Sequence, residues 1–219
     1  IGTCWVADEA VSMESARIAQ GCRVCGEAIV SEQARVFGKA YVTDMAHVGG
    51  EARVHASARI TGSAMVLGSA KVFGNARISD KAILKDRAKV SGYARVADSA
   101  VIRGDATIFD AVYVRERARV IGHAEIREEA VISGDAIVKD DVVINDRAWV
   151  HDNATIMGDA WLISDDEVGG DAIIATRQDF EQLIEQTTTQ PALGEAPTKS
   201  PALTVFNYDI KQAPPSLYF

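Results

Sequence analysis

Aliphatic side chains recur at every sixth position along most of this chain. From Val6 to Ile174 each sixth residue is Val, Ile or Leu, with Ser12 as the single exception. Two residues before each aliphatic residue stands a small one, nearly always alanine. Two residues after it the chain mostly has Gly, Asp or Glu, so the repeating unit is Ala-x-Val-x-(Gly/Asp)-x.

A period of six predicts strands rather than helices. Six is a multiple of two, so a strand points the Ala and the Val of each unit to one side, whereas a helix scatters them around its circumference. The Gly or Asp that follows tolerates the backbone conformation of a sharp corner. Hexapeptide periods of this kind are typical of parallel β-helices, in which each coil packs on the next about 4.8 Å away.

The repeats resemble those of a known family. Residues 72–77 (Val-Phe-Gly-Asn-Ala-Arg) and 132–137 (Ile-Ser-Gly-Asp-Ala-Ile) look like units of the hexapeptide-repeat superfamily. The resemblance covers residues 1–175 and implies an all-β fold, a left-handed three-sided parallel β-helix, which at this length has about ten coils. The Ala-Arg-Val-x-Gly-x-Ala form is most similar to the uncharacterised YdcK-like bacterial and phage proteins, often labelled acyltransferases. Proteins of this superfamily are typically trimers or dimers, so the resemblance also implies a homo-oligomer.

The pattern changes after the β-helix of residues 1–175. Residues 176–187 are predicted to form a short amphipathic helix that begins at an N-cap, Thr176. Its apolar residues recur at helical spacing: Phe180, Leu183 and Ile184. Laid over the last coil, this helix would cover the open end of the core and its unpaired strand edges.

The rest of the chain is predicted to form a linker and a tail. Residues 188–203 contain three prolines among small and polar residues, which predicts an extended linker. Residues 204–219 are rich in apolar and aromatic side chains. We expect this tail to dock on its own or a neighbouring subunit, or to serve as a recognition peptide for another protein.

Composition narrows the class of protein. No apolar run approaches the roughly 18 residues of a membrane-spanning helix, and no secretory signal is visible. The net charge of −8 disfavours a general nucleic-acid binder. Since the chain starts at Ile1 in mid-pattern, we expect further residues upstream.

The three cysteines do not form a disulfide framework. Cys4 and Cys22 lie eighteen residues apart in the small register, so they would stack in adjacent coils, where a bridge is conceivable but simple packing is the preferred interpretation. Cys25 is predicted to point outward, so it cannot join Cys22 in a CxxC site. These observations favour a reduced, cytoplasmic protein.

One outward face of an eighteen-residue coil is apolar. A contiguous apolar patch of this size is rarely left uncovered, so we predict a subunit interface here, with the C-terminal segment or an external partner as alternatives. The predicted interface residues are Val11, Met13, Ile29, Met65, Leu67, Ile83, Val101, Ile121, Ile137 and Met157.

The other two faces carry basic columns beside aromatic residues. Such surfaces are typical of proteins that track a polyanion. However, stacked residues of one type also follow from repeat duplication, and acidic corner residues such as Asp44, Asp80 and Asp98 would neutralise the arginines. Local neutralisation is therefore the preferred interpretation, with anion binding as the alternative. The candidate anion-binding residues are Arg17, Arg35, Arg53, Lys71 and Lys89 on one face and Arg59, Arg77 and Arg95 on the other.

Enzymatic readings depend on histidine, because related acyltransferases use one as a general base. His47 is the candidate catalytic residue, since an interface on the apolar face would enclose it. Acetyl-CoA or another acyl-CoA would then be the cofactor. Against this reading, the inserted loop that helps such enzymes build their sites is missing. No two histidines are a multiple of eighteen residues apart, so we predict no metal site.

The sequence thus favours a rigid oligomeric scaffold or binding module without catalytic activity. The first alternative is a CoA-dependent acyltransferase with its site at a subunit interface. The second is a binder of an anionic polymer through the arginine-rich faces.

Overall fold

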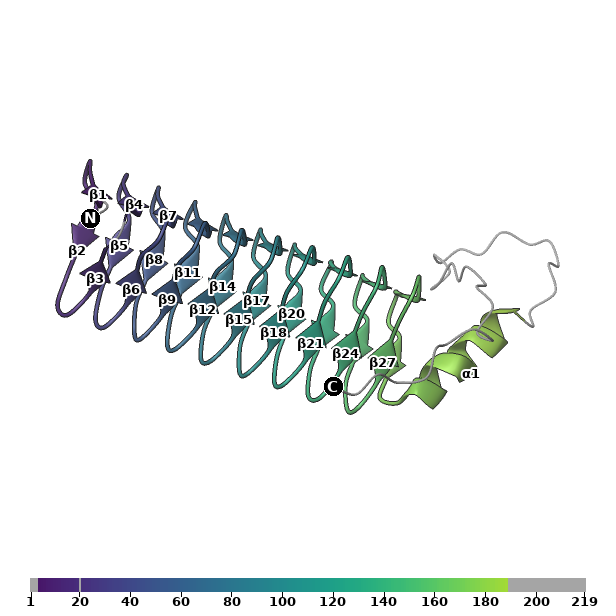
Figure 1. Cartoon of the computed structure of the whole chain (residues 1–219). Helices are drawn as coiled ribbons and strands as arrows, with labels where there is room; N and C mark the ends of the chain where they lie inside the picture. Colours follow the sequence, from purple (N-terminus) through teal and green to yellow (C-terminus); the bar gives the residue numbers. More distant parts are fainter. Residues whose placement is uncertain (1–3, 20, 189–219) are drawn as a thin grey trace.

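Two-residue strands, joined by sharp corners, wind the chain into a three-sided parallel β-solenoid (Figure 1). This architecture comes from a computed structural model that describes residues 4–19 and 21–188. Each strand pairs in parallel with the strands eighteen residues before and after it, as Arg77 does with Arg59 and Arg95. The predicted all-β, three-sided parallel solenoid is confirmed, and its sheets of ten, ten and nine strands make about nine turns, against the ten expected.

The strands stack into three sheets, named here A, B and C. Sheet A contains β1 (Trp5–Val6), β4 (Arg23–Val24), β7 (Tyr41–Val42), β10 (Arg59–Ile60), β13 (Arg77–Ile78), β16 (Arg95–Val96), β19 (Tyr113–Val114), β22 (Val131–Ile132), β25 (Trp149–Val150) and β28 (Glu167–Val168). Sheet B contains β2 (Val11–Ser12), β5 (Ile29–Val30), β8 (His47–Val48), β11 (Met65–Val66), β14 (Ile83–Leu84), β17 (Val101–Ile102), β20 (Arg119–Val120), β23 (Ile137–Val138), β26 (Thr155–Ile156) and β29 (Ile173–Ile174). Sheet C contains β3 (Arg17–Ile18), β6 (Arg35–Val36), β9 (Arg53–Val54), β12 (Lys71–Val72), β15 (Lys89–Val90), β18 (Thr107–Ile108), β21 (Glu125–Ile126), β24 (Val143–Ile144) and β27 (Trp161–Leu162).

The core is the pair of inward registers that the sequence pattern marks. From Val24 to Leu162 every aliphatic residue of the six-residue period is fully buried. Burial of each such side chain contributes roughly 1.5–3 kcal/mol relative to exposure. The first coil packs less completely, since Val6 is 48% exposed. The core therefore runs as one continuous column along the axis.

Acidic residues at the corners join one coil to the next. They adopt positive φ, as at Asp44 (φ 61°) and Glu116 (φ 62°). Most of these side chains accept a hydrogen bond from the backbone N–H one coil further on, as Asp44 Oδ2 does from Gly62 at 2.8 Å and Glu116 Oε2 from Gly134 at 2.8 Å. The corner carboxylates therefore satisfy backbone donors that the short strands leave unpaired.

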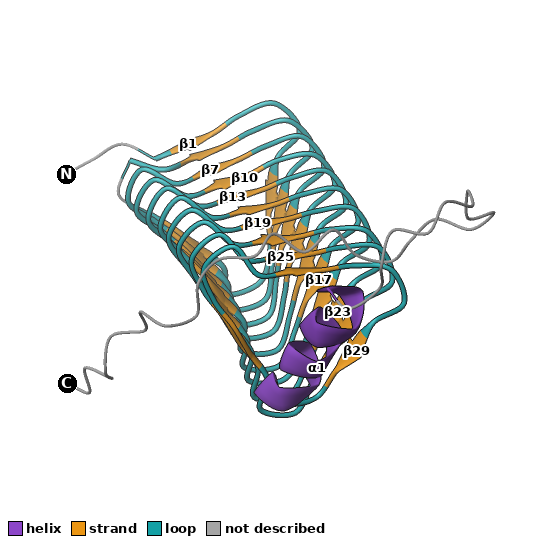
Figure 2. Ribbon diagram, turned by 90° about the vertical axis from the view of Figure 1, so that its right-hand side faces the viewer, coloured by secondary structure: helices purple, strands orange, loops and turns teal. Residues whose placement is uncertain are grey.

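Helix α1 (Arg177–Thr188) closes the C-terminal end of the solenoid, as Figure 2 shows looking along the axis. Phe180 is 0% exposed and extends the core beyond the last coil. The N-terminus of the helix has a capping box, because the Asp179 N–H donates to Thr176 Oγ1 at 3.2 Å and Asp179 Oδ2 accepts from the Thr176 N–H at 2.7 Å. The predicted capping helix is confirmed.

Cys4 and Cys22 stack in adjacent coils as free thiols with their sulfur atoms 3.4 Å apart. Burial, together with the neighbouring Cys4, raises the pKa of Cys22 to about 12. Cys25 lies in an outward column, as predicted, but it is buried, because Tyr41 and Thr43 from the next coil contact its sulfur. An outward register position is therefore no guarantee of an accessible thiol.

Two sets of expectations lie outside this description. The linker of residues 188–203, beyond Thr188 itself, and the tail of residues 204–219 fall outside the described residues. Within the described ranges, no helix has both the length and the apolar character that crossing a bilayer requires.

Candidate functional site

The outward face of sheet B carries the fewest charged side chains of the three. Its strands present an apolar column interrupted by His47, Arg119 and Thr155. A second column follows one residue beyond each strand and is interrupted by Ser31, Gly49, Lys85, Arg103 and Lys139. The strand column holds Val11, Ile29, Met65, Ile83, Val101 and Ile137, and the second column holds Met13, Leu67, Ile121 and Met157. We call these ten residues the apolar stripe. The structure thus brings all ten predicted interface residues onto one sheet.

His47 lies within the apolar stripe on β8, in register with Ile29 and Met65. Its Nε2 is 2.9 Å from the hydroxyl of Ser31, which is buried. Gly49 leaves room for this contact, because a Cβ at that position would come within 3.1 Å of the imidazole. No carboxylate of the described residues orients the ring. His47 is therefore a half-buried imidazole on an open face, paired with a hydroxyl.

The remaining histidines are held in structural contacts. His55 is stacked between Phe37 and Phe73, with ring centroids 4.9 and 5.2 Å away. Burial, followed by the charges of Arg53 and Lys71, lowers the pKa of His55. None of these contacts leaves the ring facing a nucleophile.

His151 forms a cluster that the sequence pattern did not reveal. Its two ring nitrogens lie 3.0 Å from Asp152 Oδ2 and 3.1 Å from Glu167 Oε1, and the ring packs 4.2 Å from that of Trp149. The ring occupies the space over Gly169, where a Cβ would collide with it. Because both nitrogens face carboxylates, this imidazole is unsuited to act as a general base. The glycine at position 169 was the sequence signal that could have indicated this cluster.

The basic column of sheet C stacks in register over five coils. Arg17 pairs with Arg35, Arg35 with Arg53, Arg53 with Lys71, and Lys71 with Lys89. Beside the column, the Phe37–His55–Phe73 stack is nearly parallel, with interplanar angles of 10° and 5°. His55 is therefore covered on both faces, and Phe37 and Phe73 are each covered on one face.

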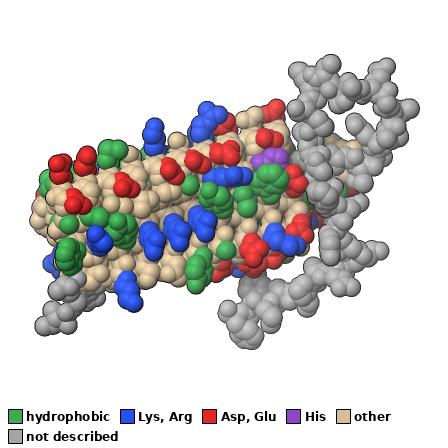
Figure 3. Space-filling model, turned by 90° about the horizontal axis from the view of Figure 1, so that it is seen from above, with side chains coloured by type: hydrophobic (Ala, Val, Ile, Leu, Met, Phe, Trp, Pro, Cys, Tyr) green, Lys and Arg blue, Asp and Glu red, His purple; other side chains and the backbone are tan. Residues whose placement is uncertain are grey.

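Sheet A carries the second basic column. Arg59, Arg77 and Arg95 stack in register between Tyr41 and Tyr113. Figure 3, which looks onto this face, shows a row of Lys and Arg side chains between hydrophobic ones. An open groove of about 380 Å³ follows the column, and its lining residues are Arg59, Thr61, Arg77, Ser79, Asp80, Arg95, Ala97, Asp98 and Tyr113. We call it the sheet A groove.

Among the described residues, the corner carboxylates expected to neutralise these arginines form no ion pair with them. Asp44 and Asp98 instead accept backbone N–H groups of the next coil, and Asp80 accepts both the Ser79 hydroxyl at 2.7 Å and the Asp98 N–H at 3.3 Å. Among the described residues, no ion pair involves any of the eight candidate anion-binding residues. The corners hold the coils together and leave the columns charged.

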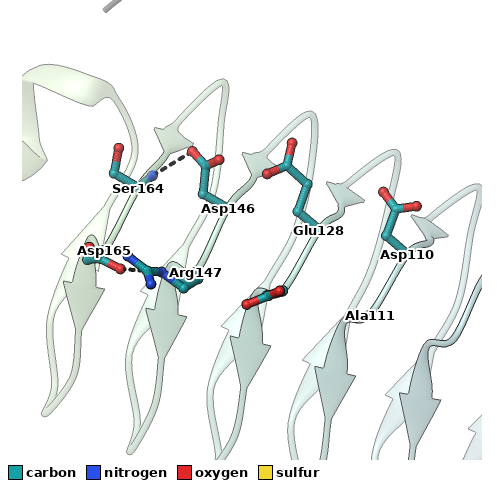
Figure 4. A pocket seen from close by; sticks show the side chains of 8 residues that line it. Asp110, Ala111, Glu128, Asp146, Arg147, Ser164 and Asp165 are labelled. Atoms are coloured by element: carbon teal, nitrogen blue, oxygen red, sulfur yellow. Dashed lines mark hydrogen bonds and ion pairs between the residues drawn. The ribbon is translucent and has the colours of Figure 1, made fainter. Parts of the chain in front are cut away.

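An acidic groove lies further along, at the corner between sheets C and A (Figure 4). Asp110, Glu128 and Asp146 occupy successive coils there, and Arg147 pairs with Asp165. A hydrogen bond with Asp146 raises the pKa of Glu128, whereas the Ser164 N–H, and then Glu128, lower the pKa of Asp146. Within the described part of the chain, no three His, Cys, Asp or Glu side chains are arranged to hold a metal ion.

Comparison with known proteins adds little beyond the fold. No family model matches the chain, and no curated protein matches it. A solved structure that resembles it is Arabidopsis UDP-N-acetylglucosamine acyltransferase, with a TM-score of 0.31 and 13% sequence identity over 76% of this chain and 69% of that one. At this level of similarity, no conclusion about activity follows.

Proposed function

We propose that this protein is a rigid binding scaffold without catalytic activity, assembled through the apolar stripe of sheet B. The observation that carries the proposal is the unbroken register. Every strand from β1 to β29 follows the preceding one after six residues, so no inserted loop interrupts the solenoid to wall off a reaction chamber. The grooves along its faces are open, which suits binding of an extended partner better than enclosure of a small substrate.

A second copy of the chain is the occupant we propose for the stripe. Apolar side chains recur along most of this face, and Val11, Met13 and Met65 are 42%, 44% and 36% exposed. Two such flat, evenly spaced faces can interdigitate along their length. Because both partners present the same residues, the contact would be isologous and closed.

The test is the molar mass in solution, measured by multi-angle light scattering on wild type and two single variants. Ile83→Glu places a charge in the centre of the stripe and should yield a monomer. Val143→Glu makes the same change at the equivalent outward position of sheet C and should leave the oligomer intact. A wild-type monomer, or an oligomer that survives Ile83→Glu, would contradict assembly through sheet B.

A CoA-dependent acyltransferase is the second candidate, favoured by the contact between His47 and Ser31 and by the resemblance of the repeats to YdcK-like proteins. In that case, assembly through sheet B would enclose His47, which would act as the general base toward an acceptor hydroxyl or amine. Calorimetric titration of the oligomer with acetyl-CoA separates the two candidates. Binding that His47→Ala abolishes would support the transferase, and absence of binding would support the scaffold.

A further inference from the structure

The sheet A groove combines three kinds of polar group in a regular array. Arg59, Arg77 and Arg95 repeat once per rung. The hydroxyls of Thr61 and Ser79 lie in the neighbouring column and line the same groove. At about 4.8 Å per rung, the five coils from Tyr41 to Tyr113 extend over about 19 Å.

The guanidinium groups of this groove have no anionic partner among the described residues. Like charges stacked directly opposite one another destabilise a sheet, so a column of three arginines that form no ion pair is an unfavourable arrangement for the free protein. An anionic ligand would relieve the repulsion. Guanidinium groups also bind carboxylate and sulfate oxygens in a bidentate manner, which a lysine cannot do.

The corner between sheets C and A adds to the positive potential. In the first five coils its residues include Lys39, Ser57, Asn75 and Tyr93 but no carboxylate. Lys39 lines a second open groove, with Tyr41, Ser57 and Arg59, that shares Arg59 with the sheet A groove. A ligand can therefore continue from one groove into the next along the axis.

Two features of the groove disfavour a nucleic acid. The tyrosine rings at the two ends of the arginine column are already covered, because the guanidinium of Arg23 lies 5.9 Å from the ring centroid of Tyr41 and that of Arg115 lies 5.6 Å from the ring centroid of Tyr113. Stacking platforms are the usual means of binding single strands. The far wall of the groove also carries Asp80 and Asp98, which would repel a dense row of phosphates.

The same carboxylates suit a ligand that carries hydroxyl groups. One oxygen of each accepts the backbone N–H of the next coil: Asp80 Oδ2 from Asp98 and Asp98 Oδ2 from Glu116. The other oxygen of each accepts no hydrogen bond from a described residue, so it can accept one from a sugar hydroxyl. The arginines can bind anionic groups, and the Ser, Thr and Asp side chains can bind hydroxyl groups. The groove therefore suits a chain in which anionic groups and hydroxyl groups alternate.

We propose that the sheet A groove binds a linear acidic polysaccharide along the solenoid axis. The arginine column would hold its carboxylate groups, and Thr61, Ser79, Asp80 and Asp98 would bind its ring hydroxyls. The inference rests on the proposed role as a binding scaffold and names its ligand class. It does not depend on the oligomer, because the groove and the apolar stripe lie on different sheets.

The test uses fluorescently labelled polygalacturonate oligomers and the full-length protein. The triple variant Arg59→Thr, Arg77→Thr, Arg95→Thr removes the column, and it should fold, because Thr107 and Thr155 occupy equivalent outward strand positions. The matched control, Arg35→Thr, Arg53→Thr, Lys71→Thr, removes equal charge from sheet C. We expect the sheet A variant to lose affinity by about tenfold or more and the control by less than about threefold.

Four results would overturn the proposal. The first is no binding of polygalacturonate by the wild-type protein. Because the oligomer is measured separately, this result would contradict the proposed ligand without contradicting assembly through sheet B. The second is an equal loss in both triple variants, which would indicate diffuse charge attraction. The third is equal or tighter binding of a single-stranded thymidine oligomer or of polyglutamate at matched charge. The fourth is self-association that depends on salt and is abolished in the sheet A variant. The arginine column would then bind the acidic groove of a second copy of the chain.

Discussion

Arg177 Nη1 lies 2.6 Å from Asp166 Oδ2 and joins helix α1 to the last coil of the solenoid. Asp166 stands in the register that elsewhere holds alanine, cysteine or valine, and the same oxygen accepts the Ile163 N–H at 2.9 Å. Burial raises the pKa of Asp166, and the hydrogen bonds from Ile163 and Arg177 oppose this shift. The guanidinium also packs 4.8 Å from the ring centroid of Phe180. One arginine thus connects the carboxylate that breaks the repeat with the phenylalanine that ends the core.

Replacing this arginine should loosen the cap. In Arg177→Gln the buried Asp166 loses its cationic partner, and removing one partner of a buried pair costs more than the pair contributes. We expect amide hydrogen exchange in α1 and in β27 to β29 to accelerate by about tenfold or more, as the solenoid behind them stays protected. Gln178→Ala, one residue along the same helix and exposed, is the control. Unchanged exchange in Arg177→Gln would show that Phe180 alone holds the helix.

The corner hydrogen bonds make a separate prediction at Asp44. Asp44→Ala removes the acceptor for the Gly62 N–H and keeps a side chain at positive φ, so we expect a loss of about 1 kcal/mol in the free energy of unfolding. Asp44→Gly removes the same acceptor but suits the positive φ, which offsets part of the loss. Urea denaturation should therefore rank wild type above Asp44→Gly and Asp44→Gly above Asp44→Ala. Equal stability of the two variants would mean that backbone conformation does not matter at this corner.

His55 should make stability depend on pH. Its pKa in the folded protein is lowered from the ordinary 6.5, so below that pH the unfolded chain binds a proton that the folded protein resists. The free energy of unfolding should therefore fall as the pH drops from 6.5 through the folded pKa, and this term vanishes above 6.5. His55→Phe continues the Phe37–Phe73 stack and should show a smaller decline between about pH 7.5 and 5 than wild type.

The cysteines should differ in reactivity. Cys22 is 1% exposed and has a pKa of about 12, so almost none of it is thiolate at neutral pH. Iodoacetamide at about pH 8 should leave Cys22 unmodified in the folded protein and modify it after denaturation, as read by peptide mass spectrometry. The half-buried Cys4 provides the internal comparison. Rapid alkylation of Cys22 in the native protein would indicate that the first coils open readily.

The fold was predictable because the sequence signals that specify it are local and repeated. Val90 and its equivalents mark the inward direction every six residues, and Thr176 with Asp179 marks the helix start. Each signal lies within a few residues of the structure that it specifies. The apolar stripe and the arginine columns were predictable for the same reason, since eighteen residues per coil assigns every outward position to a face.

What could not be predicted depends on contacts between coils whose partners are not fixed by the period. The acidic corner residues could as well have paired with arginines, and only the geometry shows that Asp44 and Asp98 bind backbone N–H groups instead. The His151 cluster needs side-chain directions from two coils, and so does the burial of Cys25 beneath Tyr41 and Thr43. Such side chains have several rotamers, and the repeat does not choose among them.

Because every strand of the solenoid is bonded to the strands eighteen residues before and after it, one whole coil can be added or removed without changing the kind of contact that any remaining coil makes. The length of this molecule along its axis can therefore change in steps of about 4.8 Å, the rise of one coil. A globular protein cannot grow in this way, because its surface and its core change together. In this fold, duplication of the DNA that encodes one coil could lengthen the arginine column, and with it the length of ligand that the proposed site would bind.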